Sequence, residues 1–248
     1  MPPAIRLKNI ALHYGGMDVL TGVNLEVHPG ETKVILGPSG VGKSTILKAI
    51  LGLLRPRHGE VYVHEREISR LPERDLVQMR LRMAMVFQHG ALFDSMTVAD
   101  NVSFRLREWG LIPRDRIEAK VREVLQFVGL AGASKLRPSQ LSGGMKKRVA
   151  IARALAPDPE IFLFDEPTVG LDPVNLFNVE QLILKLKQQH KRTMVVVTHD
   201  VGSAYRLADS IVMLHEGQFI FEGSVEALKQ AKDKRIRDFL DPAAAVSS

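Results

Sequence analysis

The chain has 248 residues, of which 45% are hydrophobic, enough apolar material for one large or two small compact domains. It has no cysteine, which excludes disulfides and thiolate metal sites and fits a reducing compartment. The net charge of +6 comes from basic residues interleaved with 28 acidic ones. Because they form no basic block with aromatic stacking residues, we do not expect a dedicated nucleic-acid-binding protein.

The opening residues resemble no secretory signal, because no charged start is followed by an apolar run and a cleavage site. No uncharged stretch approaches the roughly 20 residues that span a bilayer. We therefore expect a cytosolic protein that does not cross a membrane by itself.

The first elements alternate apolar and polar residues. Residues 4–14 and 23–29 have the pattern of half-buried antiparallel strands, and the glycines of residues 15–22 predict a turn between them. An antiparallel β-lobe is therefore expected at the N-terminus. The apolar run at residues 31–37 then predicts a strand, and residues 43–54 have helical spacing.

From about residue 73 to residue 133 the apolar spacing becomes helical, with breaks at glycine and proline, which predicts an inserted helical subdomain. An apolar strand at residues 161–165, a helix at 173–190, a β-branched strand at 193–200 and a helix ending near Ala208 follow. Strands that alternate with helices predict an α/β protein with a mostly parallel, covered sheet.

The stretch GPSGVGKST, residues 37–45, lies between a predicted strand and a predicted helix, which is the setting of a phosphate-binding loop. Its glycines let backbone N–H groups curl around phosphates, and the helix N-terminus adds its positive dipole end. We expect Lys43 to reach the β and γ oxygens and Ser44 to ligate Mg²⁺. A purely structural glycine turn is a poor alternative, because the bare pattern arises by chance in roughly one chain in a hundred.

Two acidic residues end the apolar strand at 161–165. Asp165 is expected to hold Mg²⁺ across from Ser44, and Glu166 is expected to polarise an attacking water as catalytic base. A solvated strand end is the alternative for an isolated pair of acids. The phosphate-binding loop in the same chain favours the functional interpretation.

Three further polar or aromatic residues are weaker candidates. His199 follows the β-branched strand, where α/β proteins place ligands, and could position the γ-phosphate. Gln88 follows the apolar run at residues 83–87 and borders the helical insertion, and it is a candidate for contact with Mg²⁺ or water, although taken alone it would be an ordinary polar strand end. Tyr14 could stack on an adenine ring or simply pack the lobe.

A second glycine-rich turn, Ser142 to Gly144, opens another predicted helix about a hundred residues after the phosphate loop. A serine and two glycines at a helix start can bind an anion. A helix N-cap by Ser142 is compatible with this role. Residues 145–148, MKKR, look like a basic targeting motif, but the helical pattern that continues after them favours a solvated helix face.

In residue type and order, these motifs resemble those of the ATP-binding subunits of ABC transporters over residues 4–227. The matching positions are Tyr14, residues 37–45 (Walker A), Gln88 (Q-loop), 142–144 (signature), 165 and 166 (Walker B and catalytic glutamate), Asp172 (D-loop) and His199 (switch histidine). The resemblance implies a P-loop NTPase of the ABC type, with a mostly parallel core sheet, an N-terminal antiparallel β-lobe and an inserted helical subdomain. It divides the chain into an ABC ATPase domain at 1–227, with the insertion at about 89–157, and a short extension at 228–248.

The resemblance also implies the ligands, ATP and Mg²⁺. Glu166, His199 and Gln88 are expected to be catalytic, and Ser44, Gln88 and Asp165 to hold the metal. The residues expected to bind ATP are Tyr14, Gly37, Pro38, Ser39, Gly40, Val41, Gly42, Lys43, Ser44, Thr45, Ser142, Gly143 and Gly144. In this family the signature turn contacts the nucleotide of a second copy, which implies a head-to-tail dimer with two sandwiched ATPs. Met145, where glutamine is usual, leaves that turn intact.

Residues 87–102 and 138–155 are similar to those of ATPase subunits from Mla-type phospholipid transport systems. His89 and Gln140 depart from the serine and glutamate usual there. The similarity implies a subunit at the cytoplasmic face of the bacterial inner membrane that helps to maintain outer-membrane lipid asymmetry. Its implied partners are an integral membrane permease and an MCE-domain lipid-binding protein. A small cytoplasmic accessory subunit is compatible with this assembly, and no nucleic-acid partner is expected.

Two other functions stay open from the sequence: the ATPase of an importer for polar solutes, and a soluble P-loop ATPase that acts on nucleic acid. The C-terminal run at residues 229–246, which contains RIRDFL at 235–240, also has two interpretations. It resembles a short amphipathic tail that contacts a dimer partner or a small subunit, and it could equally be a frayed terminus.

Overall fold

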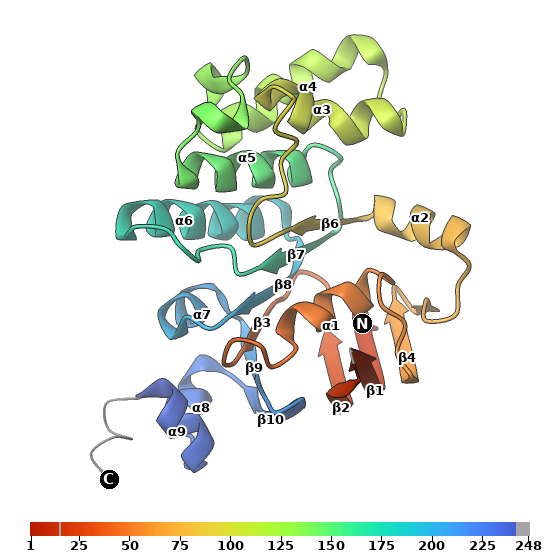
Figure 1. Cartoon of the computed structure of the whole chain (residues 1–248), viewed down its shortest axis with the longest axis vertical. Coiled ribbons are helices and arrows are strands. Elements are labelled where there is room, and N and C mark those ends of the chain that lie inside the picture. The colour runs from red at the N-terminus through yellow and green to blue at the C-terminus, as the bar shows by residue number, and fades with distance from the viewer. Residues whose placement is uncertain (15, 242–248) are drawn as a thin grey trace.

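The computed structural model describes residues 1–14 and 16–241, with the side chains of Tyr14 and His190 left out of the description. A small antiparallel sheet lies beside a larger, mostly parallel sheet, and a group of helices stands at the far end of the molecule (Figure 1). This is the predicted α/β architecture with an N-terminal β-lobe.

The N-terminal lobe is a four-stranded antiparallel sheet in the order β2-β1-β4-β5. Its strands are β1 (Ile5–Tyr14), β2 (Met17–Val27), β4 (His58–Val63) and β5 (Arg66–Glu67). The turn predicted at residues 15–22 was too long, because β2 already begins at Met17 and pairs that residue with Tyr14. Gly22 lies inside β2, opposite a part of β1 where the pairing register shifts, so it belongs to an irregular strand pair.

The core sheet has six strands in the order β10-β9-β3-β8-β7-β6, parallel except for β10, which pairs antiparallel with β9. Its strands are β3 (Thr32–Leu36), β6 (Met83–Val86), β7 (Ile161–Asp165), β8 (Thr193–Thr198), β9 (Ser210–His215) and β10 (Gln218–Gly223). Every residue of β3, β7 and β8 is buried, as expected for parallel strands covered on both faces.

Helices cover the core sheet and extend beyond it. Their bounds are α1 (Lys43–Ile50), α2 (Glu73–Leu81), α3 (Val98–Glu108), α4 (Arg114–Phe127), α5 (Gly143–Leu155), α6 (Pro173–His190), α7 (Val201–Leu207), α8 (Val225–Lys229) and α9 (Lys234–Leu240), with 3₁₀ turns η1 (Ala131–Ala133) and η2 (Pro138–Gln140). α3, α4 and α5 pack on one another at the top of Figure 1. The insertion predicted at about 89–157 contains these three helices.

The helical pattern predicted from residue 73 is interrupted. α2 ends at Leu81, and Met83–Val86 is strand β6, which pairs with β7 at the edge of the core sheet. The apolar run was too short for its periodicity to distinguish a strand from the end of a helix. Strands β4, β5, β9 and β10 were also missing from the predicted elements.

Alternate residues of β3 pack into two separate cores. Val34 and Leu36 belong to the cluster that continues into α3–α5, whereas Ile35 belongs to the cluster shared with the lobe and α1. Because successive side chains of a strand point to opposite faces, β3 is packed into both cores, and this packing fixes the start of the loop that follows it. The first core also includes Ile236 of α9, so the RIRDFL segment packs onto the domain in this structure.

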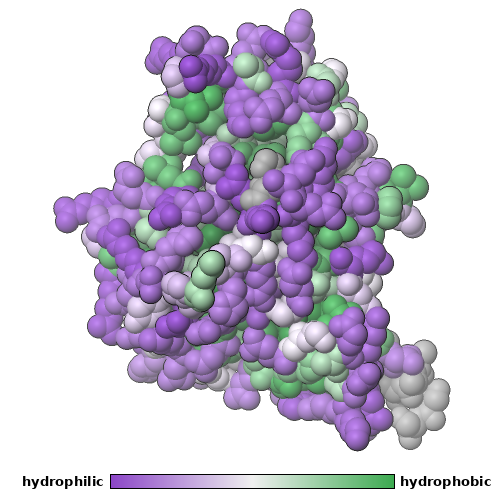
Figure 2. All heavy atoms as spheres, turned by 180° about the vertical axis from the view of Figure 1, so that it is seen from behind, coloured by the Kyte–Doolittle hydropathy of each residue, from purple (hydrophilic) through white to green (hydrophobic). Residues whose placement is uncertain are grey.

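Seen from behind, the surface is mostly hydrophilic, and its apolar areas are scattered over several elements (Figure 2). Exposed apolar residues of this kind are normal on a folded domain. Within residues 1–14 and 16–241, no helix has both the length and the apolar character needed to cross a membrane.

Candidate active site

The predicted phosphate-binding loop connects β3 to α1. The fully buried strand ends at Leu36, and α1 begins at Lys43 after Gly42, which has a left-handed φ of 103°. A Cβ atom at Gly42 would also lie 2.9 Å from the Val19 side chain. Glycine is therefore required here by both backbone conformation and packing.

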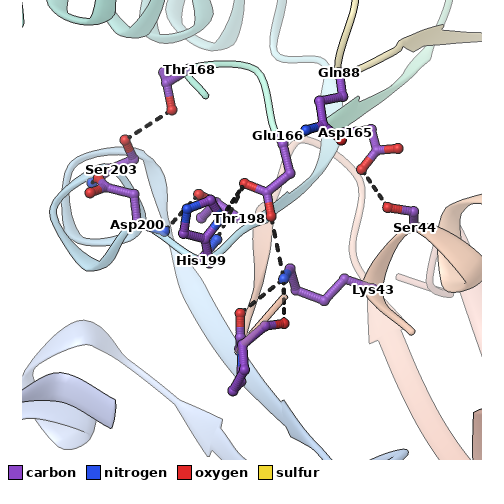
Figure 3. Close-up of polar contacts among 12 residues, drawn as sticks. Lys43, Ser44, Gln88, Asp165, Glu166, Thr168, Thr198, His199, Asp200 and Ser203 are labelled. Carbon is purple, nitrogen blue, oxygen red and sulfur yellow. Dashed lines mark hydrogen bonds and ion pairs between the residues drawn. The ribbon is translucent and has the colours of Figure 1, made fainter. Parts of the chain in front are cut away.

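The Lys43 side chain folds back across this loop. Its ammonium donates hydrogen bonds to the carbonyl oxygens of Gly37, at 2.9 Å, and Pro38, at 2.8 Å. It also lies 3.3 Å from Glu166 Oε1 (Figure 3). Lys43 is only 5% exposed, so its positive charge is confined to the loop and the carboxylate that faces it.

Ser44 and Asp165 meet although 121 residues separate them in sequence. The Ser44 hydroxyl donates a hydrogen bond of 2.7 Å to Asp165 Oδ1, from the first turn of α1 to the end of β7. Both belong to the carboxyl end of the parallel sheet, because β3 and β7 flank β8. The two oxygens are close enough to serve one cation.

Glu166 has a strained backbone and a well-oriented carboxylate. Its φ is 46°, in the left-handed region that non-glycine residues seldom adopt, and its N–H donates to the Val197 carbonyl at 3.0 Å. His199 Nδ1 lies 3.0 Å from Glu166 Oε2, and the His199 N–H donates to the same oxygen at 3.3 Å. The carboxylate is thus held between Lys43 and His199 (Figure 3).

These residues surround one cavity of about 450 Å³. Its lining residues are Val19, Ser39, Gly40, Gly42, Lys43, Ser44, Thr45, Gln88, Glu166, Val169 and His199. The structure therefore brings the phosphate loop, Gln88, Glu166 and His199 together around one cavity. Asp165 adjoins the cavity through Ser44.

The predicted signature residues lie elsewhere. Ser142 caps α5 by accepting a hydrogen bond from the Met145 N–H at 3.3 Å, and it does not line the cavity of its own chain. A Cβ atom at Gly144 would lie 2.2 Å from Asn175 Oδ1 at the start of α6, so a side chain there would displace Asn175. Tyr14 ends β1, but its side chain lies outside the described residues.

A buried polar network supports the loops after Glu166 and His199. Glu180 of α6, 1% exposed, accepts a hydrogen bond from the Ser203 hydroxyl at 2.6 Å and two from the Arg206 guanidinium at 2.6 and 2.9 Å. Ser203 also lies 3.4 Å from the hydroxyl of Thr168 (Figure 3). The network fixes α7, which follows His199, relative to α6.

Lys147 was missed from the sequence, because the whole segment 145–148 was expected on a solvated helix face. Lys146 is exposed as predicted, but Lys147 is 7% exposed and donates hydrogen bonds to the carbonyls of Gln88 and Glu166. Burial lowers the pKa of Lys147, and the nearby Asp165 and Glu166 oppose that shift. The helical spacing from Gly144 to Ile151 could have revealed it, because residue 147 lies on the same face.

The residues at the cavity fit a nucleotide with Mg²⁺. Among the described residues no group of three or more acidic or histidine side chains is arranged to hold a metal alone. Mg²⁺ usually takes one or two protein oxygens and completes its shell with phosphates and water. The Ser44 and Asp165 oxygens beside a glycine-lined phosphate loop suit that arrangement.

Residues 20–169 match the ABC transporter family. The chain is an ABC transporter ATP-binding protein. As an ABC ATPase it hydrolyses ATP, and ABC ATPases in general bind ATP with Mg²⁺. The dimeric bacterial ABC transporter cassette MJ0796 superimposes on this ABC ATPase with a TM-score of 0.82 at 37% identity, over 89% of this chain and 98% of that one.

Curated relatives include transport proteins of more than one kind. MlaF, the ATP-binding protein of the intermembrane phospholipid transport system of Haemophilus influenzae, is 42% identical to this ABC ATPase over 236 residues, or 95% of this chain and 89% of that protein. MlaF of Escherichia coli is 40% identical over 237 residues, or 96% and 88% of the two chains. The methionine import ATP-binding protein MetN of Carboxydothermus hydrogenoformans is 42% identical over 224 residues, or 89% and 66%.

Proposed function

We propose that this ABC ATPase powers a phospholipid transporter of the Mla type. The observation that carries the proposal is the identity of 42% and 40% to two MlaF proteins over nearly the whole of both chains. On this proposal the protein lies at the cytoplasmic face of the bacterial inner membrane, bound to a permease that works with an MCE-domain lipid-binding protein. Its work helps to maintain the lipid asymmetry of the outer membrane.

In the proposed site, the phosphate loop from Gly37 to Thr45 cradles the phosphates of ATP with its N–H groups. Lys43, which now contacts two loop carbonyls, neutralises the β and γ oxygens. Ser44, Asp165 and Gln88 hold Mg²⁺, which supplies positive charge next to the phosphates. The geometry favours this division because Lys43 contacts the carbonyls of the loop, whereas Ser44 contacts Asp165 (Figure 3).

Glu166 is the proposed catalytic base. Its carboxylate lines the cavity and is oriented by two contacts to His199, so it can accept a proton from a water that attacks the γ-phosphate. His199 positions that carboxylate and faces the same space. Its half-exposed ring can also reach a phosphate oxygen.

The proposed dimer joins two copies head to tail. Ser142 and Gly143 are exposed at the start of α5 and face no nucleotide cavity of their own chain, so a second copy can use them. The N-terminus of this 13-residue helix offers free N–H groups and a positive dipole end to a phosphate. The dimeric form of the MJ0796 cassette supports this arrangement.

A groove of about 440 Å³ beside Gln88 is the proposed permease contact. It lies between α2, β6 and α3, and its exposed aromatic side chains are Phe87, Phe93 and Trp109. Exposed aromatic residues around a groove are typical of protein-binding surfaces. Because residue 87 precedes Gln88 in the chain, a partner in this groove lies next to the proposed active site.

The decisive experiment separates lipid from solute transport. The ABC ATPase should be purified with its permease and MCE-domain protein, placed in liposomes, and supplied with labelled phospholipid or labelled methionine. We expect ATP-dependent phospholipid transfer that is lost in Glu166→Gln. Methionine uptake without lipid transfer would instead favour the importer function, which the 42% identity to MetN keeps as the second candidate.

A further inference from the structure

Lys147 lies at the junction of three functional segments. It is in the second turn of α5, and its ammonium donates one hydrogen bond to the carbonyl of Gln88, at 2.5 Å, and another to the carbonyl of Glu166, at 3.2 Å. The side chain is 7% exposed. One buried cation thus connects the signature helix to the segment after β6 and to the segment after β7.

Both carbonyls belong to chain segments that have left their strands. β6 ends at Val86 and β7 at Asp165, so Gln88 and Glu166 lie beyond the ladder that would otherwise pair their oxygens. A buried carbonyl without a donor is unfavourable, and a charged donor forms the stronger kind of hydrogen bond. Apart from Lys147, the Glu166 carbonyl accepts a long hydrogen bond of 3.4 Å from the Val169 N–H.

The bond to Glu166 acts at a strained point of the backbone. Glu166 has a φ of 46°, and such a conformation persists only where its surroundings hold it. The Val197 carbonyl holds the Glu166 N–H from one side, and Lys147 holds its carbonyl oxygen from the other. The direction of the carboxylate depends on this peptide, since the side chain starts from the same Cα atom.

We propose that Lys147 is a positioning residue for ATP hydrolysis, which fixes the main chain of Gln88 and Glu166 to the signature helix. This inference rests on the proposed role of Glu166 as catalytic base. Since α5 begins at the signature turn, a shift of that turn against a nucleotide on a second copy moves Lys147 and, with it, both carbonyls. Lys147 therefore connects the signature turn, which contacts the ATP on the second copy, with Glu166, which acts on the ATP in the cavity of its own chain.

The test compares Lys147→Met with Lys146→Met in the full-length ABC ATPase assembled with its membrane partners. Methionine keeps much of the length of lysine but removes the charge and the donor, and Lys146 is the exposed neighbour on the same helix. ATP affinity, kcat and thermal midpoint are measured for both variants, for Lys147→Arg and for Glu166→Gln. We expect kcat to fall about 10²-fold in Lys147→Met, because a displacement of about 1 Å has that effect on a catalytic group.

In the expected result, ATP affinity of Lys147→Met stays within about threefold of the parent, Lys147→Arg recovers part of kcat, and Lys146→Met matches the parent. Parental kcat in Lys147→Met, while Glu166→Gln is inactive, overturns the role of Lys147 and leaves the base in place. A parallel loss of ATP affinity, thermal midpoint and kcat, with no recovery in Lys147→Arg, also overturns it, because Lys147 then only supports the fold. If Glu166→Gln retains parental kcat, Glu166 is not the catalytic base, and the proposed role of Lys147 is overturned with it.

Discussion

Lys43 Nζ lies 3.3 Å from Glu166 Oε1, so the lysine of the phosphate loop and the proposed catalytic base form an ion pair. The two side chains are 5% and 10% exposed, and water screens the pair weakly. Phosphate oxygens in the cavity would compete with Glu166 for the ammonium. The carboxylate could then turn to a water, so nucleotide binding and release of the base would occur together.

Replacement of the two partners should therefore have different effects. Lys43→Ala removes the cation that faces the phosphates, and we expect ATP affinity to fall by roughly 10- to 10²-fold, as for the loss of a charged hydrogen bond. Glu166→Gln frees Lys43 from its carboxylate, so ATP affinity should be kept, while kcat falls by about 10² or more. Nucleotide-binding titrations and phosphate release measure the two quantities. Near-parental hydrolysis by Glu166→Gln in the assembled transporter would exclude Glu166 as the base.

The 2.7 Å contact between Ser44 and Asp165 predicts how hydrolysis depends on Mg²⁺. Asp165→Asn removes a negative charge beside the proposed metal position, and the Mg²⁺ concentration for half-maximal hydrolysis should rise about tenfold or more. A chelator should abolish hydrolysis by the parent, and added Mg²⁺ should restore it. Asp94→Asn, on the exposed surface outside the cavity lining, is the control and should leave the Mg²⁺ dependence unchanged.

Mixed dimers test whether each ATP is shared between two chains. Lys43→Ala disables one phosphate loop and Ser142→Arg one signature turn, and occluded ATP per dimer is counted in a Glu166→Gln background. If the site is shared, changes on different subunits damage the same site twice and leave one ATP occluded. Both changes on one subunit damage both sites and leave none.

The opposite pattern in the mixed dimers would mean that each signature turn serves its own chain. Because Ser142 also caps α5, Ser142→Arg should lower the free energy of unfolding by about 1 kcal/mol. A urea titration of the single variant checks that this loss leaves the domain folded.

The aromatic groove predicts a separation between assembly and ATP binding. Trp109, 48% exposed, lines the groove, so Trp109→Ser should reduce co-purification of the permease while ATP affinity stays within about threefold of the parent. Leu53→Ser is the matched control, because Leu53 is 51% exposed in the turn after α1 and does not line the groove. Equal co-purification of the two variants would remove Trp109 from the permease contact.

Trp109 is a better test of the permease contact than the two arginines of α3, Arg105 and Arg107, because of what surrounds them. Arg105 donates to the carbonyls of Met83 and Arg80, at 3.1 and 2.9 Å, and burial lowers its pKa. Charge reversal at Arg105 would therefore disturb folding and partner binding together. Arg107 lines a different cavity, between α3 and α4, and pairs with Asp100 at 3.0 Å.

Acid should weaken the contact between the lobe and the core sheet. Burial and the nearby Arg82 lower the pKa of His64 below its ordinary 6.5, although Glu160 opposes the shift from 3.1 Å. The folded chain thus binds fewer protons than the unfolded chain at His64. The contribution of this residue to the free energy of unfolding is therefore fully present above pH 6.5 and decreases as the pH falls below that value. Hydrogen bonds from Arg82 lower the pKa of Glu160 below its ordinary value of 4.5. The loss of unfolding free energy on acidification therefore continues below pH 4.5.

His64→Gln should therefore reduce the loss of unfolding free energy between about pH 7.5 and pH 5.5. Urea titrations across this range measure the effect. His28→Gln is the control, because His28 is exposed just after β2. A slope in His64→Gln equal to that of the parent would show that another group causes the acid dependence.

Several features could be predicted from the sequence because their causes are local. The phosphate loop is contiguous, and its glycines, lysine and serine follow from the geometry of a single strand-to-helix turn. β7 and β8 appear as apolar runs because both of their faces are buried. Glu166 and His199 could be placed in one site because parallel strands end at the same edge of the sheet.

Features that depend on pairing or packing between distant segments were missed or misplaced. Met83–Val86 becomes a strand only because β7 offers an edge to pair with, and no periodicity in so short a run requires it. The lobe strand β2 begins earlier than predicted because β1 pairs with residues that look like turn formers. Lys147 looked solvated because a charged residue usually is, and its burial depends on two carbonyls that lie 59 and 19 residues away in sequence.

The sequence alone determined which chemical groups the site has, since motif spacing and strand ends are properties of short segments. The tertiary structure decided which of those groups share a cavity and which face outward. Ser44 and Asp165 meet, whereas Ser142 stays on the surface of its own chain, because strand order and helix packing set distances that no local pattern contains.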